Sequence, residues 1–322
     1  MAQATRRTLC AALAAVLARP SLAQPDFPNR PVRLIVPFPA GGTVNGIARL
    51  FAENFARFAD QPMVVDNRPG AGGTIAEQAV IRAPADGYTL LFATLGALVI
   101  NAFTYRQSAD NARLLAPIGM VSETPMVLIA HNAMPASVAA LLDHAAAHPE
   151  AVSFATPGNG TMPHLLAERF AARAGIRLLH VPYQGGSAQL TDVLAGRTNL
   201  TFDSLLSAIS MLQAGTVRAL AVTSPQRVPQ LPAVPTMAEA GLPDLTYGFW
   251  TSIAAPAATP EPVRSRLAAI LAETLRAPET EQAFAQFGVV PKPATPAEFQ
   301  ALLDRERALW RPVAERIAAT MR

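Results

Sequence analysis

The chain has 322 residues, of which 51% are hydrophobic and 15% are charged. This length allows two domains with a sizeable core, and the composition excludes an intrinsically disordered protein. The formal net charge of +3 at pH 7 is small, and it indicates no nucleic-acid partner.

The N-terminus has the pattern of a secretory signal peptide. Arg6 and Arg7 precede an apolar run at residues 9–17, and Ser21-Leu22-Ala23 supplies the small residues that a signal peptidase needs. The run is about half of the ~20 residues that would span a bilayer, so it predicts no membrane anchor. We expect residues 1–23 to be removed and the mature chain to lie in the periplasm, exported by either the Sec or the twin-arginine route.

Removal of this segment changes the charge and the redox chemistry of the protein. The segment contains three arginines and no acidic residue, which leaves 23 basic and 23 acidic residues in the mature chain. It also contains Cys10, the only cysteine of the sequence, so no disulfide is expected after cleavage.

Short β-rich runs alternate with amphipathic helical runs along most of the chain. The apolar residues Ile47, Leu50 and Phe51 recur at helical spacing, and further helices are expected at 165–174 and 188–194. Such alternation predicts an α/β fold with mostly parallel sheets. The expected strands are residues 32–38, 63–65, 88–93, 126–130, 152–155, 178–181, 200–202, 219–223 and 250–255.

The chain ends in two apolar helical stripes that no strand follows. One contains Val263, Leu267 and Leu275, and the other contains Phe299 and Trp310. We expect both helices to pack back on the first domain, which makes that domain discontinuous, and residues 224–243 to wrap the second. The expected organisation is a first lobe of residues 24–123 plus 250–322 and a second lobe of residues 124–249, with hinge strands near 121–125 and 247–250.

The usual catalytic motifs are absent from the sequence. It contains no Gly-x-Ser-x-Gly elbow, no His-Glu-x-x-His and no phosphate-binding P-loop. His144 and His148 have i, i+4 spacing, but they lie in an Ala-rich helix that suits a solvated surface better than a metal site. We therefore expect no enzyme, no metal and no cofactor.

Four glycine-rich turns occur where a strand should pass into a helix. They lie at residues 37–43, 67–74, 156–161 and 181–187. Helix N-termini offer free N–H groups and the positive end of the helix dipole, so these turns are candidates for binding an anion. Each turn alone can equally reflect tight backbone geometry, and none completes a dinucleotide fingerprint.

The same residues resemble the Bug family, the receptors of bacterial tripartite tricarboxylate transporters. The resemblance is carried by the opening from Arg30 to Gly42, the Asp66–Gly73 segment, Asp86-Gly87-Tyr88-Thr89-Leu90, Gly158–Thr161 with His164, and Val181-Pro182-Tyr183 before Gly185-Gly186. It extends in order over nearly the whole mature chain, where Val234-Pro235-Thr236, Glu239-Ala240-Gly241 and Trp250 follow.

This resemblance implies a two-lobed Venus-flytrap fold of the type II kind that closes on a small carboxylate and passes it to membrane permease subunits. It implies a protein that binds solute, as a monomer in our interpretation, and is not an enzyme. A ligand sensor for a membrane receptor and a periplasmic hydrolase using His164 or His180 remain alternatives. The ligand-binding residues expected are Phe38, Gly41, Gly42, Thr43, Gly72, Gly73, Asn159, Gly160, Thr161, His164, Tyr183, Gly185, Gly186 and Asp203.

Two positions leave alternatives open. Asp203 follows an apolar strand, so it can be a helix N-cap or an acidic residue at the cleft. Asn45 stands where the family usually has an aspartate. If Asn45 lies near the ligand, the missing negative charge favours a carboxylate that has no amino group.

Overall fold

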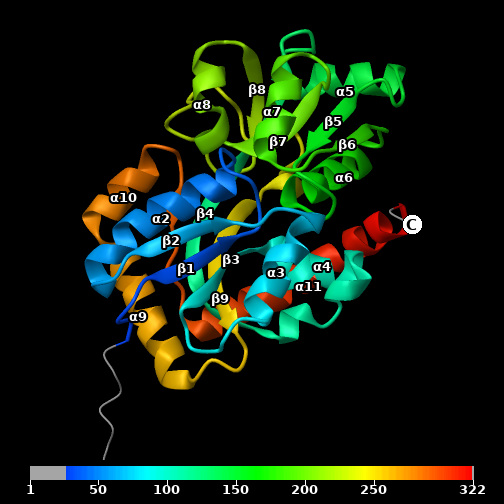
Figure 1. Cartoon of the computed structure of the whole chain (residues 1–322). Helices are drawn as coiled ribbons and strands as arrows, with labels where there is room; N and C mark the ends of the chain where they lie inside the picture. Colours follow the sequence, from blue (N-terminus) through cyan, green and yellow to red (C-terminus); the bar gives the residue numbers. More distant parts are fainter. Residues whose placement is uncertain (1–26, 321–322) are drawn as a thin grey trace, which may run out of the picture.

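The computed structural model describes residues 27–320, and the expected signal peptide lies outside this range. Two α/β lobes are stacked, with residues of the middle of the chain forming the upper lobe and both ends of the described chain contributing to the lower one (Figure 1). The mixed α/β fold predicted from the alternation of strands and helices is confirmed.

The sheet of the first lobe has the order β2-β1-β3-β9-β4, with the short β10 on the outer edge of β4. Strands β1, β2 and β3 are parallel, whereas β9 runs antiparallel to both of its neighbours. Their bounds are β1 Val32–Val36, β2 Met63–Asn67, β3 Thr89–Thr94, β4 Leu115–His131, β9 Gly248–Pro256 and β10 Val290–Pro291.

The sheet of the second lobe repeats this arrangement. Its order is β6-β5-β7-β4-β8, in which β5, β6 and β7 are parallel and the second half of β4 is the antiparallel strand. In each lobe the antiparallel strand next to the three parallel ones arrives from the other lobe. The bounds are β5 Ser153–Thr156, β6 Leu179–Pro182, β7 Leu200–Ser204 and β8 Val217–Val222.

Helices cover both faces of the first sheet. Helices α2, α9 and α10 pack together on one face, and α11 packs against α4 and β4 on the other (Figure 1). The α-helices are α2 Thr43–Ala59, α3 Thr74–Ile81, α4 Asn101–Thr104, α5 Val138–Ala147, α6 Met162–Ala174, α7 Gly186–Leu194, α8 Leu205–Gln213, α9 Glu261–Arg276, α10 Pro278–Ala285 and α11 Pro296–Thr320. The expected packing of the two terminal apolar helices, now α9 and α11, on the first lobe is observed. No described helix is both long enough and apolar enough to cross a membrane.

Strand β4 is longer than the sequence predicts. It runs for 17 residues, pairing with β9 up to Pro125 and with β7 and β8 from Met126 onward. A hinge strand was expected near residues 121–125, but residues 115–120 were not, because Pro117 and Gly119 interrupt them and proline cannot donate to a strand ladder. Two register shifts between β4 and β9 accommodate these residues.

A buried carboxyl group on α11 connects this helix to the strand that returns from the second lobe. Glu306 is 5% exposed and accepts hydrogen bonds from the Tyr247 hydroxyl at 3.0 Å, the Trp310 indole at 2.7 Å and the Trp250 indole at 3.4 Å. Burial raises the pKa of Glu306, and these three hydrogen bonds oppose the rise. The Glu306 carboxyl group therefore accepts from three donors where α11 packs beside the start of β9.

Replacement of this carboxyl group should destabilise the fold. In Glu306→Ala three donors lose their acceptor, and we expect the free energy of unfolding to fall by about 2–4 kcal/mol in urea titrations. Glu315→Ala, on the same helix, removes only the exposed ion pair with Arg311 and should change the unfolding free energy by less than about 0.5 kcal/mol. Equal losses in the two variants would contradict this role of Glu306.

Candidate functional site

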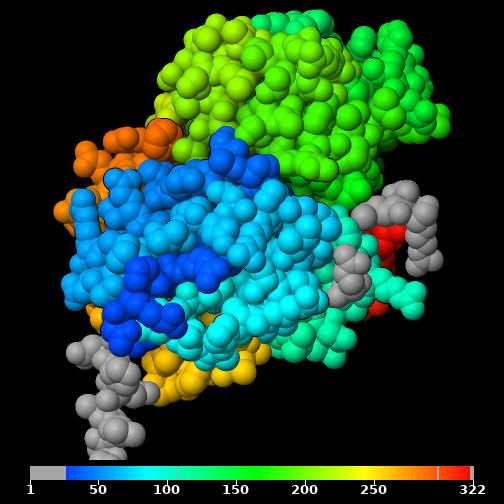
Figure 2. Space-filling view, viewed as in Figure 1, coloured from blue at the N-terminus to red at the C-terminus, as the bar shows by residue number. Residues whose placement is uncertain are grey.

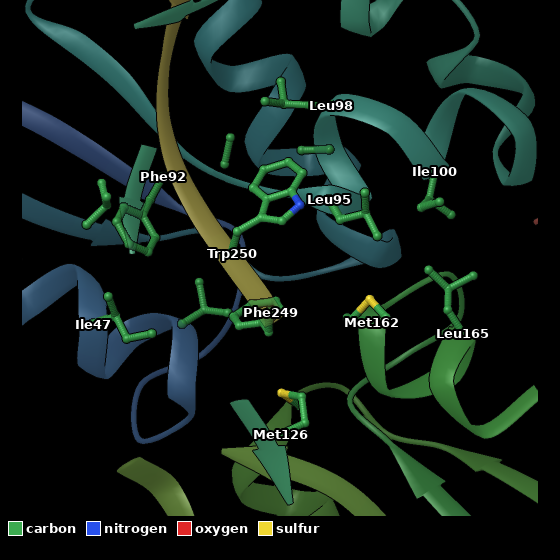
Figure 3. Close-up of a cluster of buried hydrophobic side chains, with 14 of the residues drawn as sticks. Ile47, Phe92, Leu95, Leu98, Ile100, Met126, Met162, Leu165, Phe249 and Trp250 are labelled. Atoms are coloured by element: carbon green, nitrogen blue, oxygen red, sulfur yellow. The ribbon is translucent and has the colours of Figure 1, made fainter. Parts of the chain in front are cut away.

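A small cavity lies between the two lobes. The cavity volume that the centre of a water molecule can occupy is about 50 Å³. One part of its wall is apolar, and Figure 3 shows Leu95, Met126, Met162 and Phe249 of this wall within a larger cluster of buried side chains drawn from both lobes. The cavity is lined by Phe38, Gly42, Thr43, Val44, Gly72, Thr94, Leu95, Gly96, Met126, Pro157, Thr161, Met162, Pro163, Gly186, Gln189, Asp203 and Phe249.

Three helices begin at this cavity. The first turns of α2 and α7 begin directly after Gly42 and Gly185, and α6 begins after Thr161. Within residues 27–320 none of these three N-caps makes a side-chain capping hydrogen bond. Their terminal N–H groups and positive dipole ends are therefore available to an anion. No Lys, Arg or His of the described chain is part of the cavity wall.

The two lobes touch directly beside the cavity. Thr43 Oγ1 lies 2.7 Å from Asp203 Oδ1, 2.8 Å from Ser204 Oγ and 2.9 Å from Ser207 Oγ, and it donates to Asp203. The Tyr105 hydroxyl donates to the carbonyl oxygen of Asn159 at 3.3 Å. Figure 2 shows the second lobe resting on the first along this boundary. The structure is therefore a closed form.

Glycine permits the closest of these contacts. A Cβ atom on Gly42 would lie 3.6 Å from the backbone nitrogen of Gly186, and a Cβ atom on Gly186 would lie 3.7 Å from Cα of Gly42. The first atom of any side chain would thus already be in van der Waals contact with the opposite lobe, and further atoms would separate the lobes.

Asp203 is the acidic residue of the cavity wall. It is 4% exposed, and its Oδ1 accepts from Thr43, from the Ser204 N–H at 2.8 Å and from Ser207 at 2.7 Å. Gln189 Nε2 donates to Oδ2 at 2.8 Å. Burial raises the pKa of Asp203, and the hydrogen bonds lower it in part. The N-cap of α8 is Ser204, so of the two interpretations of Asp203 the structure shows the position at the cleft.

The cavity wall contains half of the residues expected from the sequence. These are Phe38, Gly42, Thr43, Gly72, Thr161, Gly186 and Asp203. The other expected residues are not part of the wall and are Gly41, Gly73, Asn159, Gly160, His164, Tyr183 and Gly185. Several of these support the turns: Gly41 lies against Ser187, and Gly185 lies against Pro39. The Tyr183 hydroxyl donates instead to Asp192, at 2.7 Å.

Some residues of the wall were not expected, and Gln189 is the main one. It is fully buried on α7, in the buried face that also contains Leu190 and Val193. A glutamine among the buried positions of an amphipathic helix is a signal that the sequence contained, since such a side chain needs polar partners. Phe249 and Met126 were not predicted because they lie on β9 and β4, and no local sequence pattern indicates that these crossing strands pass beside the cavity.

Asn45 does not face the cavity. Its Oδ1 accepts from Asn67 Nδ2 at 2.9 Å, and Asn67 Nδ2 also donates to the carbonyl oxygen of Phe38 at 2.7 Å. Asn45 therefore supports the turn after β1 from behind. The argument that its neutrality selects against amino groups has no geometric basis in this structure.

A stacked histidine pair supports the turn after β5. His164 is 4% exposed, and its Nδ1 accepts from the Gly160 N–H at 3.3 Å. Its ring stacks on His180 with centroids 3.8 Å apart, and His180 Nε2 lies 2.6 Å from Thr156 Oγ1. Burial, followed by the charge of His164, lowers the pKa of His180 to about 4. Neither imidazole lines the cavity, so the two histidines that the hydrolase alternative requires are not at that site.

No metal site accompanies these residues. Over residues 27–320, no group of three or more His, Cys, Asp or Glu side chains is arranged to hold a metal ion.

Comparison with known proteins identifies relatives over most of the chain. The model of the tripartite tricarboxylate transporter family receptor matches residues 47–318. A UPF0065 protein from the tcbD-tcbE intergenic region of Pseudomonas sp. strain P51 is 39% identical over 290 residues, covering 88% of this chain and 85% of that protein. Protein BugT of Bordetella pertussis is 33% identical over 303 residues, covering 92% of each chain. The resemblance to the Bug family is confirmed.

Solved structures share the two-lobed fold. Rpa4515 of R. palustris with adipate has a TM-score of 0.86 and 34% identity, covering 91% of this chain and 98% of that one. MatC (Rpa3494) of Rhodopseudomonas palustris with bound malate has a TM-score of 0.83 and 28% identity, covering 91% of this chain and 100% of that one.

The histidine pair should make stability depend on pH. The folded-state pKa of His180 is about 4, below the ordinary value of 6.5, so between these values the unfolded chain binds more protons than the folded one. Stability should therefore fall as the pH is lowered from 6.5 toward 4. His180→Gln removes this titration and should show a smaller difference in urea midpoint between pH 7 and pH 5 than wild type.

The exposed His148 supplies the control, since His148→Gln should keep the wild-type dependence on pH. The role assigned to His180 is wrong if His180→Gln and wild type lose stability in parallel on acidification.

Proposed function

The chain belongs to the tripartite tricarboxylate transporter receptor family, and we propose that it captures a small carboxylate in the cavity between its lobes for such a transporter. The observation that carries this proposal is the convergence of the N-termini of α2, α6 and α7 on one cavity. Backbone N–H groups and helix dipoles can hold a carboxylate without a cationic side chain.

The wall also suits the carbon chain of such a ligand. Phe38, Met126, Met162 and Phe249 offer apolar surface beside the helix N-termini. A mostly apolar wall with a few convergent polar groups is the usual composition of a small-molecule site. Adipate and malate, which the structures of Rpa4515 and MatC contain, are dicarboxylates of this general kind.

The proposed contacts fall into two groups. Gly42, Thr43, Thr161, Gly186 and Asp203 would face the ligand, with Phe38 and Gly72. The expected residues that are not part of the wall, Gly41, Gly73, Asn159, Gly160, His164, Tyr183 and Gly185, would shape the turns instead.

Ligand capture would be a hinge motion of the two lobes. We assign residues 24–123 plus 250–322 to the first lobe and 124–249 to the second, with the hinge where β4 and β9 cross between them. A ligand can favour the closed form only by binding it more tightly than the open form, through donors from both lobes.

The remaining parts of the proposal follow from the family and the sequence. The protein would act in the periplasm after cleavage of residues 1–23, as a monomer that performs no catalysis. It would deliver its ligand to the membrane permease subunits of the transporter.

A thermal-shift screen of the mature chain against dicarboxylates, aromatic acids and amino acids tests this function. A ligand at one hundred times its dissociation constant should add about 2.7 kcal/mol to the unfolding free energy. Stabilisation by one class of carboxylate, with the compound recovered unchanged, is the expected result. Chemical turnover of any member, or stabilisation by amines alone, would contradict the proposal.

A larger residue at Gly186 should weaken binding by opposing closure. The side chain of Gly186→Val would extend past the Cβ position that already touches Gly42, so we expect affinity to fall about tenfold or more with little change in melting temperature. Calorimetric titration with the carboxylate from the screen measures the effect.

Ala188→Val is the matched control, because it adds the same side chain to an exposed position of α7. Normal affinity in Gly186→Val would show that closure does not bring these two turns together.

A further inference from the structure

Gln189 and Asp203 form a hydrogen-bonded pair in the cavity wall. Gln189 is 0% exposed and Asp203 is 4% exposed, and the side chains of both residues line the cavity. Gln189 Nε2 lies 2.8 Å from Asp203 Oδ2. The other amide atom of the glutamine, Oε1, is buried and has no hydrogen-bond partner among the described residues.

An unpaired buried acceptor beside an anion-binding cavity is an unfavourable arrangement. A carboxylate ligand is itself an acceptor, so it cannot satisfy Oε1. The Gln189 amide has a second orientation, in which the side-chain oxygen and nitrogen atoms exchange places. In that orientation Oε1 lies near Asp203 Oδ2, and the NH₂ group is free to donate to a carboxylate.

The second orientation requires a proton on Asp203. Two acceptors cannot bond to each other, so Oδ2 must carry a hydrogen that it donates to Gln189 Oε1. Oδ1 keeps all three of its donors, Thr43, Ser204 and Ser207, because it remains the carbonyl oxygen of the acid. Every polar atom of the pair then has a partner once a carboxylate is bound.

No charged side chain contacts the Asp203 carboxyl group, so its ionised form has no ion-pair partner among the described residues. Side chains from α2, α7 and α8 contact its carboxyl group, namely Thr43, Gln189 and Ser207, and all are uncharged. On β4 the backbone partner of Asp203 is Val127, which is also uncharged. The pKa of Asp203 is raised chiefly by burial. A ligand carboxylate in the same cavity would raise this pKa further, because like charges oppose ionisation.

We propose that the protein binds its carboxylate together with one proton, which resides on Asp203 Oδ2, and that Gln189 then donates from its amide nitrogen to the ligand. This inference rests on the proposed function. It adds Gln189 as the residue that would distinguish a ligand carrying a hydrogen-bond acceptor from one carrying a donor. The proton comes from solvent before the lobes close. The only covalent bond that forms is the O–H bond of Asp203. Because protonated Asp203 is neutral, the total charge of ligand plus Asp203 equals that of the ligand alone.

Calorimetry of the full mature chain tests the proton uptake. Adipate and malate are titrated at pH 8 in phosphate and in Tris, whose ionisation enthalpies differ, so the difference in heat reports the protons taken up. We expect uptake approaching one proton per ligand. Between pH 7 and 9 the dissociation constant should rise by up to about tenfold per pH unit, while ordinary ligand carboxylates stay ionised.

Two variants assign the proton and the donor. Asp203→Asn carries a permanent NH₂ toward Gln189 Oε1, so it should bind without proton uptake and, at pH 9, more tightly than wild type. Gln189→Leu should lose tenfold or more in affinity at every pH. Gln213→Leu, at an exposed position at the end of α8, is the control and should behave as wild type.

The outcomes separate this inference from the function beneath it. Binding without proton uptake by wild type would overturn the inference alone, as would uptake that persists in Asp203→Asn, which would place the proton elsewhere. Loss of binding in Asp203→Asn at all pH values would also overturn it. Failure of wild type to bind either acid would overturn the proposed function and this inference with it.

Discussion

The two lobes meet where two glycine turns lie close together. Gly42 and Gly186 belong to different lobes, and each lies at the start of a helix. A Cβ atom on either residue would already be in van der Waals contact with the other residue. Because the two helix ends meet at this point, N–H groups from both lobes reach the same small volume, which is the condition for an anion to hold the lobes together.

This arrangement divides recognition between two kinds of group. Backbone donors recognise charge but carry little information about the rest of the ligand. In the proposed site, selectivity for chain length and shape would fall to side chains of the wall such as Phe249, Met126 and Met162, since methionine adapts to irregular shapes. Asp203 would repel an anion if it were ionised and free, but its carboxyl group is engaged by donors from both lobes. It therefore contributes to closure itself.

The elements that can be predicted from sequence are those whose signals are local. The strand-to-helix turns were located because glycine and proline mark them, and the apolar stripes of α9 and α11 show helical spacing directly. The course of β4 was only partly predicted, since Pro117 and Pro125 are typical of turns and the pairing that overrides them involves β9, more than a hundred residues later. Local pattern contains no information on such partners.

The candidate site shows the same limit at the level of side chains. Gly42 and Gly186 could be proposed from their turns, but the direction of a side chain depends on its neighbours in space. Tyr183 follows β6 and Asn45 lies in the first turn of α2, and both bond away from the cavity, to Asp192 and Asn67 respectively. Gln189 appeared to be one more position of an amphipathic helix until its partner, 14 residues later, was placed beside it.

The repeated strand order determines where the two lobes are connected. In the sheet of each lobe, three parallel strands are followed by an antiparallel strand that arrives from the other lobe. These two strands are β9 in the first lobe and β4 in the second. Pro125 and Gly248 pair at the point where the partners of β4 change, so a hinge at this point would lie between the ladders of the two lobes. Glu306 holds Tyr247 and Trp250 next to this point. The proposed hinge therefore lies at the few residues of β4 and β9 that cross between the lobes, next to side chains that Glu306 fixes to the first lobe.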